Sequence, residues 1–273
     1  MTAWKAFTAE TKDQIAQVTL IGPGKGNAMG PDFWRELPLI FDGIDRNPEV
    51  RAVVLAGSGK NFSYGLDLPA MSGEFAPLLA DRALAAPRTH FHDSIKAMQA
   101  SVTAVAQCRK PVVAAVQGWC IGGGLDLIAA VDIRYASADA KFSLREAKVA
   151  IVADIGSLQR LPALIGDGHL RELAFTGKDI DAVRAEKIGL VNDVFPDAEG
   201  ALDAAHATAR EIADNPPLVV QGVKDVLGRE RSAIVAEGLR YVAAWNAAFL
   251  PSDDLGEALA ATMQKRKPEF GGR

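Results

Sequence analysis

The chain has 273 residues, of which 49% are hydrophobic, and its formal net charge of −4 gives a pI near 5.6. This length and apolar content suffice for a large core, as one big domain or as a core with an appendage. No extended basic stripe stands out, which argues against nucleic acid as the main partner. The two cysteines, Cys108 and Cys120, are too few for a disulfide framework or a zinc set, so we expect reduced thiols.

The sequence shows no signal for membrane insertion or export. Charges or glycines break every apolar stretch before the ~20 residues that a membrane helix needs. The first fourteen residues, MTAWKAFTAETKDQ, lack the apolar region of a signal peptide, and the final FGGR is not a peroxisomal signal. We therefore expect a cytoplasmic protein with no membrane partner.

Strands and helices alternate in the first part of the chain. β-Branched or alternating apolar runs bounded by Gly or Pro predict the strands, and apolar residues at helical spacing predict the helices. The predicted strands are 15–21, 50–56, 111–116, 133–136 and 141–143, and the predicted helices are 31–46, 88–108 and 122–130. This order predicts an α/β fold with parallel strands.

The second part of the chain is mainly helical. After a strand at 190–195, the predicted helices are 201–214, 217–227, 232–249 and 255–265. We therefore divide the chain into a core at 1–200, which carries the site, and a helical region at 201–273. Within the core, residues 68–87 are rich in Pro, Gly and Ala and predict a mobile lid or an irregular helical loop.

Two glycine-rich turns each follow a predicted buried strand. They are GSGKNFSYGLDL at 57–68 and WCIGGGLDL at 119–127. Glycines let backbone N–H groups approach a ligand closely, and two such turns at neighbouring strand ends could aim two N–H groups at one oxygen, forming an oxyanion hole. The alternative is that they are tight turns only. Neither turn has the G-x-G-x-x-G spacing of a dinucleotide site or a Walker phosphate loop.

Three acids lie among apolar neighbours, and an unpaired buried carboxylate costs several kcal/mol. Asp126 opens the predicted helix after the second turn, Glu146 comes 20 residues later, and Asp154 follows after another 8. Carboxyl groups of perturbed pKa could act as base and acid. Structural alternatives stay open. Asp126 could stabilise the start of its own helix, Glu146 could form a surface ion pair with Arg145 or Lys148, and Asp154 could cap a helix beginning three residues later.

Other reactive residues give weaker signals. The four histidines, His90, His92, His169 and His206, show no metal-binding spacing, and we predict no metal site. There is no G-x-S-x-G nucleophile motif. The basic run 265–267 is either a solvated helix end or a phosphate contact.

Six motifs together resemble the crotonase (enoyl-CoA hydratase/isomerase) superfamily over nearly the whole chain. They are GKGNAM at 24–29, NFSYGLDL at 61–68, KPVVAAVQGWCIGGGLDL at 110–127, DIRYAS at 132–137, LQRLPALIG at 158–166 and GLVNDVFP at 189–196. Within that superfamily the chain is similar to the Δ3,5-Δ2,4-dienoyl-CoA isomerase branch, which has Asp, Glu and Asp where this chain has Asp126, Glu146 and Asp154. Hydratases have Glu at the first of these positions and Gly at the third.

The resemblance implies an α/β fold of the crotonase type. This is a spiral of repeated ββα units with C-terminal helices that trimerise, so we expect a homotrimer or homohexamer. It also implies an acyl-CoA substrate and no separate cofactor, because coenzyme A is part of the substrate. The activity that it implies moves the double bonds of 3,5-dienoyl-CoA to give 2,4-dienoyl-CoA. The alternatives are hydration of trans-2-enoyl-CoA and binding of acyl-CoA without catalysis.

The resemblance also assigns roles to residues. The N–H groups of Leu66 and Gly123 would hold the thioester oxygen, Glu146 and Asp154 would carry protons, and Asp126 would lie between them. The implied substrate-binding residues are Ala28, Tyr64, Gly65, Asp67, Leu68, Trp119, Gly122 and Lys265. Lys265 or Lys267 would contact the adenine and 3′-phosphate of coenzyme A. Trp119 and the segment IGPGKGNAM depart from the common pattern, which leaves the acyl pocket undefined.

Overall fold

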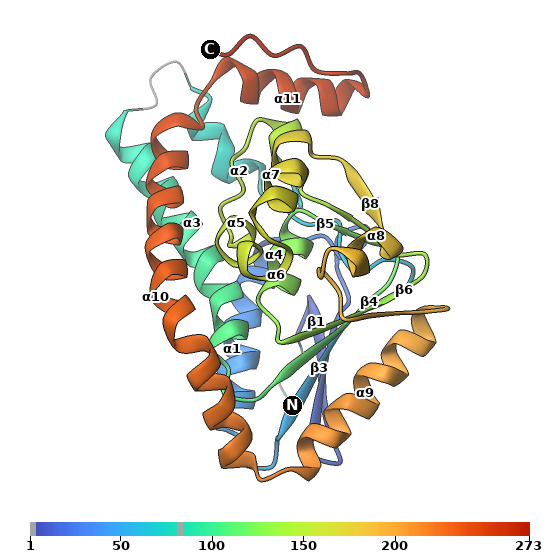
Figure 1. Cartoon of the computed structure of the whole chain (residues 1–273). Coiled ribbons are helices and arrows are strands. Elements are labelled where there is room, and N and C mark those ends of the chain that lie inside the picture. The colour runs from blue at the N-terminus through green and yellow to red at the C-terminus, as the bar shows by residue number, and fades with distance from the viewer. Residues whose placement is uncertain (1–3, 81–83) are drawn as a thin grey trace.

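A six-stranded sheet forms the centre of the computed structural model, which describes residues 4–80 and 84–273 (Figure 1). Its strand order is β1-β2-β3-β4-β6-β9. The strands are β1 (Phe7–Lys12), β2 (Ile15–Leu20), β3 (Ala52–Gly57), β4 (Val112–Val116), β6 (Ile133–Ser137) and β9 (Asp193–Phe195). β1 is antiparallel to β2, and every other neighbouring pair is parallel, as the sequence predicts.

A second sheet of three short strands stands beside the first. It consists of β5 (Trp119–Ile121), β7 (Lys141–Ser143) and β8 (Asp179–Asp181). The sequence predicts β7 but not β5, which lies within the second glycine-rich turn, or β8, which lies in the part of the chain that reads as mainly helical. β1 is also unexpected. Only Phe7 of that edge strand is buried, so no apolar pattern marks it.

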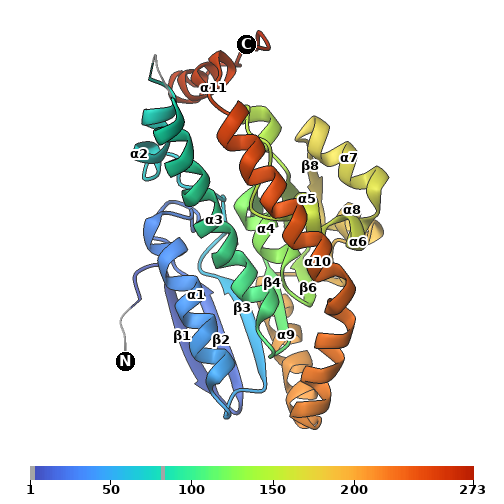
Figure 2. The same cartoon turned by 90° about the vertical axis from the view of Figure 1, so that its left-hand side faces the viewer.

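Three long helices pack side by side. Helix α3 (Ala85–Gln107) lies between α1 (Pro31–Arg46) and α10 (Pro217–Phe249), as Figure 2 shows. The prediction of two helices at 217–227 and 232–249 is wrong, since α10 is continuous. The residues between them include no proline, and the one glycine, Gly228, costs a helix only about 1 kcal/mol.

The remaining helices are short, apart from α9 and α11. They are α2 (Ser72–Phe75), the 3-10 helix η1 (Ala76–Leu78), α4 (Gly123–Ala129), the 3-10 helix η2 (Glu146–Val149), α5 (Ser157–Arg160), α6 (Pro162–Ile165), α7 (Asp167–Thr176), α8 (Ala182–Lys187), α9 (Ala198–Asp214) and α11 (Asp253–Gln264). Helices α2 and η1 make the predicted segment 68–87 an irregular helical loop in the part that the structure describes. Its expected mobility stays a prediction, and residues 81–83 lie outside the described residues.

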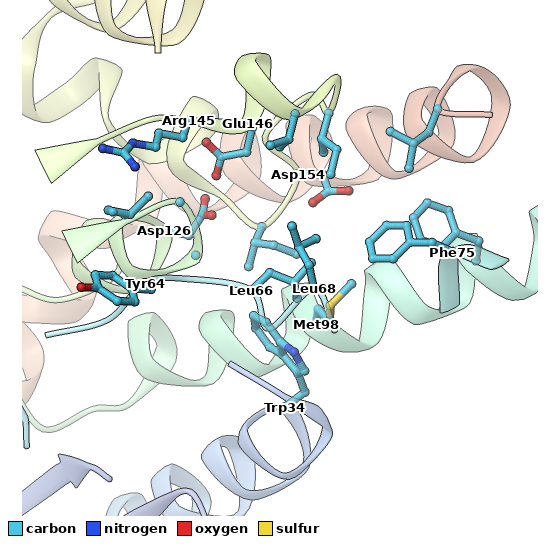
Figure 3. Close-up of a pocket in the computed structure, with 18 of the residues that line it drawn as sticks. Trp34, Tyr64, Leu66, Leu68, Phe75, Met98, Asp126, Arg145, Glu146 and Asp154 are labelled. Atoms are coloured by element: carbon cyan, nitrogen blue, oxygen red, sulfur yellow. The ribbon is translucent and has the colours of Figure 1, made fainter. Parts of the chain in front are cut away.

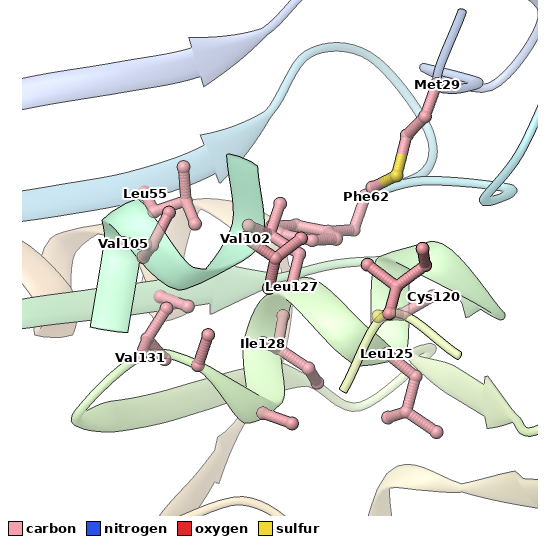
Figure 4. Packing of buried hydrophobic residues seen from close by; sticks show 14 of the residues in the cluster. Met29, Leu55, Phe62, Val102, Val105, Cys120, Leu125, Leu127, Ile128 and Val131 are labelled. Atoms are coloured by element: carbon pink, nitrogen blue, oxygen red, sulfur yellow. The ribbon is translucent and has the colours of Figure 1, made fainter. Parts of the chain in front are cut away.

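Helices cover both faces of the large sheet. On one face, Leu55 of β3, Val102 and Val105 of α3, and Leu127 and Ile128 of α4 pack into the main core (Figure 4). On the other face, alanines of α9 lie against β2, β3 and β4, and their small side chains let this helix approach closely. Coverage on both sides explains why the inner strands are continuously apolar.

Candidate active site

The two glycine-rich turns meet at one edge of the large sheet. β3 and β4 are parallel neighbours, so the turns that follow them leave from the same edge. Backbone hydrogen bonds then join the turns. Ser63 N donates to Trp119 O at 3.0 Å, and Ile121 N donates to Ser63 O at 3.0 Å. The segments 63–66 and 119–123 therefore run beside one another.

Gly65 allows the closest contact between these turns. It has a φ of +77°, and a Cβ there would lie 2.6 Å from Ile121 O and 2.9 Å from Gly123 N. The next backbone N–H, that of Leu66, lies 3.7 Å from where a Cβ on Gly123 would stand. Within residues 4–80 and 84–273, neither Leu66 N–H nor Gly123 N–H donates to a protein acceptor. Gly123 also begins α4, where the helix dipole adds positive potential. Two free donors side by side can stabilise an oxyanion.

These donors face a cavity of about 440 Å³ that is mainly apolar (Figure 3). Glu146 and Asp154 enter it from one side, and Leu66, Leu68 and Met98 lie opposite them. The lining residues are Trp34, Tyr64, Leu66, Leu68, Phe75, Phe91, Met98, Trp119, Ile121, Gly122, Gly123, Asp126, Arg145, Glu146, Val149, Ile151, Asp154, Ile155 and Leu250. All three acids of the predicted trio line this cavity.

Asp126 is buried at 1% exposure in the first turn of α4. Its Oδ1 accepts the backbone N–H of Ser157 at 2.5 Å and therefore binds the start of α5. Its place in the first turn of α4 agrees with the structural alternative of stabilisation by the helix dipole, but its side-chain hydrogen bond goes to α5 and not to its own helix. Burial raises the pKa of Asp126, while hydrogen bonding by Ser157 and the charge of Arg160 oppose the rise. Asp126 is thus the one acid of the three on which a buried cation acts.

Glu146 is the first residue of η2, and its carboxyl group faces the second glycine turn. A Cβ at Gly122 would lie 3.2 Å from Glu146 Oε1, so glycine leaves room for this carboxyl group. Oε2 is buried and has no hydrogen-bond partner among the described residues. The expected surface ion pair with Arg145 or Lys148 is wrong, because Arg145 binds Asp179 at 2.8 Å and Glu146 forms no ion pair with Lys148 among the described residues. Burial and then the charges of Asp126 and Asp154 raise the pKa of Glu146.

Asp154 lies in the loop between η2 and α5. Its Oδ2 accepts a hydrogen bond from Asn246 Nδ2 of α10 at 2.6 Å. It does not cap α5, whose N-cap is Gly156 and whose first N–H is taken by Asp126. Burial, followed by the charge of Asp126, raises the pKa of Asp154 to about 7 against the opposing effect of the Asn246 hydrogen bond. A carboxyl group with this pKa can give or take a proton near neutral pH.

The other predicted substrate-binding residues divide into two groups. Those that line the cavity are Tyr64, Leu68, Trp119 and Gly122. Gly65 directly precedes Leu66 and closely approaches Gly123 N. Ala28 and Asp67 lie together beside Gly24, where a Cβ would be 2.9 Å from Ala28 Cβ and 2.6 Å from Asp67 Oδ2. Lys265 is exposed at the end of α11, outside the cavity lining. The roles of all these residues stay predictions.

Several lining residues are absent from the sequence prediction. They are Trp34, Phe75, Phe91, Met98, Ile121, Arg145, Val149, Ile151, Ile155 and Leu250. Most are apolar residues, whose sequence pattern is the same whether they face a core or a cavity. Arg145 stacks 5.0 Å from the centre of the Trp119 ring, and Lys141 is 5.2 Å from it, so the unusual tryptophan meets two cations.

Residues 4–80 and 84–273 contain no group of three or more His, Cys, Asp or Glu side chains that could hold a metal ion. Among the helices described, none combines the length and the apolar character needed to cross a membrane.

Comparison with known proteins identifies close relatives. The chain is 43% identical over 260 residues to the peroxisomal Δ(3,5)-Δ(2,4)-dienoyl-CoA isomerase of Arabidopsis thaliana, which covers 95% of this chain and 94% of the relative. It is 42% identical to the mitochondrial enzyme of the same name from Dictyostelium discoideum, with 99% and 92% covered. A crystal structure of an enoyl-CoA hydratase/isomerase from Mycobacterium paratuberculosis matches with a TM-score of 0.82 at 29% identity, covering 93% and 97%.

These relatives confirm the resemblance and the crotonase-type α/β fold that the sequence motifs predict. The family model for enoyl-CoA hydratase/isomerase matches residues 10–273. This chain therefore belongs to the enoyl-CoA hydratase/isomerase family.

Proposed function

We propose that this chain converts 3,5-dienoyl-CoA to 2,4-dienoyl-CoA. The observation that carries the proposal is the third acid, Asp154, which lines the same cavity as Asp126 and Glu146, where burial raises its pKa to about 7. Hydration requires one water molecule held by two acids, whereas moving a conjugated diene requires proton transfer at two separated carbons. The names of relatives at 42–43% identity support the same activity.

The reaction needs one proton removed and one proton added. Loss of a C2 proton from the 3,5-diene gives an extended enolate, and protonation at C6 then leaves double bonds at C2 and C4. The N–H groups of Leu66 and Gly123 would bind the thioester oxygen and stabilise its negative charge. Glu146 and Asp154 would exchange the protons, one as base and one as acid. Asp126, which accepts a hydrogen bond from the Ser157 N–H, would lie between Glu146 and Asp154 and would be the most stabilised of the three carboxylates.

The cavity suits an acyl chain that extends beyond the acids. Phe75 and Phe91 pack together with ring centres 5.7 Å apart, and Leu250 lines the same cavity. In Figure 3, Asp154 lies between Glu146 and Phe75 along the cavity. A chain with its thioester at Leu66 and its tail toward Phe75 would therefore pass Asp154.

The test is an absorbance assay for the conjugated dienoyl-CoA formed from the 3,5-diene. We expect wild-type turnover and a loss of about 10²–10⁴-fold in kcat for Asp154→Asn, the usual range for a general acid or base. Asp42→Asn, on the exposed face of α1, is the matched control and should be fully active. Hydration of crotonyl-CoA without turnover of the diene would favour the hydratase, and acyl-CoA binding without any turnover would favour the non-catalytic alternative.

We also propose the homotrimer or homohexamer, an assembly supported by the exposed apolar side chains of α10. They are Leu218, Val219, Val223, Val226, Leu227, Ile234, Tyr241, Trp245 and Phe249. Many large apolar side chains exposed on one helix are typical of an interface. Light scattering should give a trimer or a multiple of it, and a monomer at micromolar concentration would contradict this.

The cytoplasmic location stays part of the proposal, although the names of two relatives place them in the peroxisome and the mitochondrion. Cell fractionation with a compartment marker tests it, and enrichment in an organelle fraction would refute it.

A further inference from the structure

Two buried amide side chains hold the segment that carries Asp154. Gln99 of α3 is 6% exposed, and its Nε2 donates to Asp154 O at 2.7 Å and to Leu239 O of α10 at 3.0 Å. Asn246 of α10 is 1% exposed, and its Nδ2 donates to Val152 O at 2.8 Å and to Asp154 Oδ2 at 2.6 Å. The loop is therefore tied to two long helices that are distant in sequence.

The two amides differ in what they reach. Gln99 binds only backbone carbonyl groups, whereas Asn246 binds the carboxyl group of Asp154 itself. The carbonyl of Val152 can only accept a hydrogen bond, so it fixes the amide of Asn246 with its nitrogen toward the loop. Asn246 must then offer its second N–H to Asp154. A fixed donor favours the ionised form of a carboxyl group over the protonated form.

The other charged groups at this point act in the opposite direction. Asp126 of α4 disfavours a second negative charge on Asp154, and Asp154 in turn does so for Glu146 of η2. The buried cation of α5, Arg160, acts on Asp126. The groups that α3 and α10 turn toward the loop here, Gln99 and Asn246, are both neutral. Asn246 is therefore the side chain that offsets burial and like-charge repulsion at Asp154.

We propose that Asn246 is a positioning residue that orients Asp154 and favours its ionised form, while Gln99 holds only the backbone of the loop. The effect of Asn246 on turnover rests on the proposed isomerase function. Its effect on the titration of Asp154 does not depend on that function.

The first experiment compares Asn246→Leu with Gln99→Leu as the matched control. Both changes remove a buried amide of the same loop, but only the first removes a donor to the carboxyl group. Loss of the Asn246 hydrogen bond should raise the pKa of Asp154. The limb of the kcat pH profile that reports Asp154 should therefore shift upward by about 1–2 pH units in Asn246→Leu, the size expected for a hydrogen bond to a charged group. Gln99→Leu should lower kcat without moving a limb. Equal effects of the two variants on the profile would overturn the proposal.

The second experiment needs no activity. It measures the unfolding free energy of the wild type and of Asp154→Asn as a function of pH. The difference between the two, wild type minus variant, reports the pKa of Asp154 in the folded chain. This difference should decline as pH rises and level off near pH 7. In the Asn246→Leu background it should level off about 1–2 units higher. Asn246→Ala replaces Asn246→Leu if leucine prevents folding.

The two proposals fail in different ways. If the free-energy difference levels off at the same pH in Asn246→Leu and Asn246→Ala as in the wild-type background, the role of Asn246 is overturned whatever the activity. A shift of that pH together with no turnover of the 3,5-diene would overturn the isomerase function and leave the role of Asn246 intact.

Discussion

The two sides of the candidate site are built in different ways. On one side, the turns that carry Leu66 and Gly123 follow the neighbouring strands β3 and β4, and glycines within the turns, above all Gly65, let the two backbones approach closely. On the other side, Glu146 and Asp154 lie on a segment whose contacts come from far along the chain. Asn246 reaches Asp154 across 92 residues, and Gln99 reaches it across 55.

The donor side therefore depends on where its N–H groups lie, and the acid side also depends on the pKa values of its carboxyl groups. A backbone N–H has a fixed partial charge and does not titrate near neutral pH, so the donor side works once the two turns place their N–H groups side by side. A carboxyl group is different, because its pKa depends on burial, neighbouring charges and hydrogen bonds. The acid side therefore depends on how distant elements pack around it, and changes on the two sides should produce different defects.

The largest expected effect comes from Glu146→Gln on the acid side. The change keeps the shape of the side chain but removes its ability to carry a proton, so kcat for the 3,5-diene should fall by about 10³–10⁴-fold with the fold intact. Steady-state kinetics and circular dichroism measure the two quantities. Glu186→Gln on the exposed face of α8 is the control and should behave as wild type. A fall of less than tenfold would remove Glu146 from the proton-transfer step.

On the donor side, Gly65→Ala should lower kcat by about 10²–10³-fold, the cost of one oxyanion donor. The new Cβ would stand 2.6 Å from Ile121 O, so the turns must separate and Leu66 N–H must move. Gly59→Ala is the matched control, since Gly59 also has a left-handed φ of +69° but has nothing within 4 Å of an added Cβ. Equal losses of activity in the two variants would show that backbone strain, and not separation of the turns, is the cause.

The smallest expected effect is on stability. Because burial raises the pKa of Asp154 to about 7, the folded state holds this proton more tightly than the unfolded state. The wild type therefore loses more stability than Asp154→Asn as pH rises from about 4 to 7, because the raised pKa values of Asp126 and Glu146 act in both proteins and that of Asp154 only in the wild type. Above pH 7 the variant should be more stable by roughly 1–3 kcal/mol. Urea unfolding at pH 5 and pH 8 measures this, and a less stable variant at pH 8 would refute it.

Much of the fold is predictable from local pattern, with clear exceptions. The helix predicted at 31–46 is α1 residue for residue, because its apolar stripe is regular and Pro31 marks its start. β5 and β8 have only three residues each and arise from pairing with β7, which no local pattern announces. The break predicted within α10 is also absent. The prediction is wrong because exposed apolar residues in α10 obscure the 3.6-residue period of a helix with one buried face.

The site was predictable in its acids but not in their contacts. The motifs point to Asp126, Glu146 and Asp154, yet the local partners expected for Glu146 and Asp154 are wrong, and Asp126, although in the first turn of α4, makes its hydrogen bond elsewhere. Asp126 binds the start of α5 instead of its own helix, Arg145 binds Asp179, and Asp154 binds Asn246. Each actual partner is 31 or more residues away in sequence, so sequence proximity is no guide to it.

By itself, the sequence determined the family, the parallel α/β core, the two glycine turns and the three acids, because these depend on local residue types and spacing. The tertiary structure decided that the turns meet, that the acids share one apolar cavity, and that Asn246 and Arg160 adjust the acids. The physical reason is that burial and charge act through space. The pKa of a carboxyl group is set by all the elements packed around it, whatever their order in the chain.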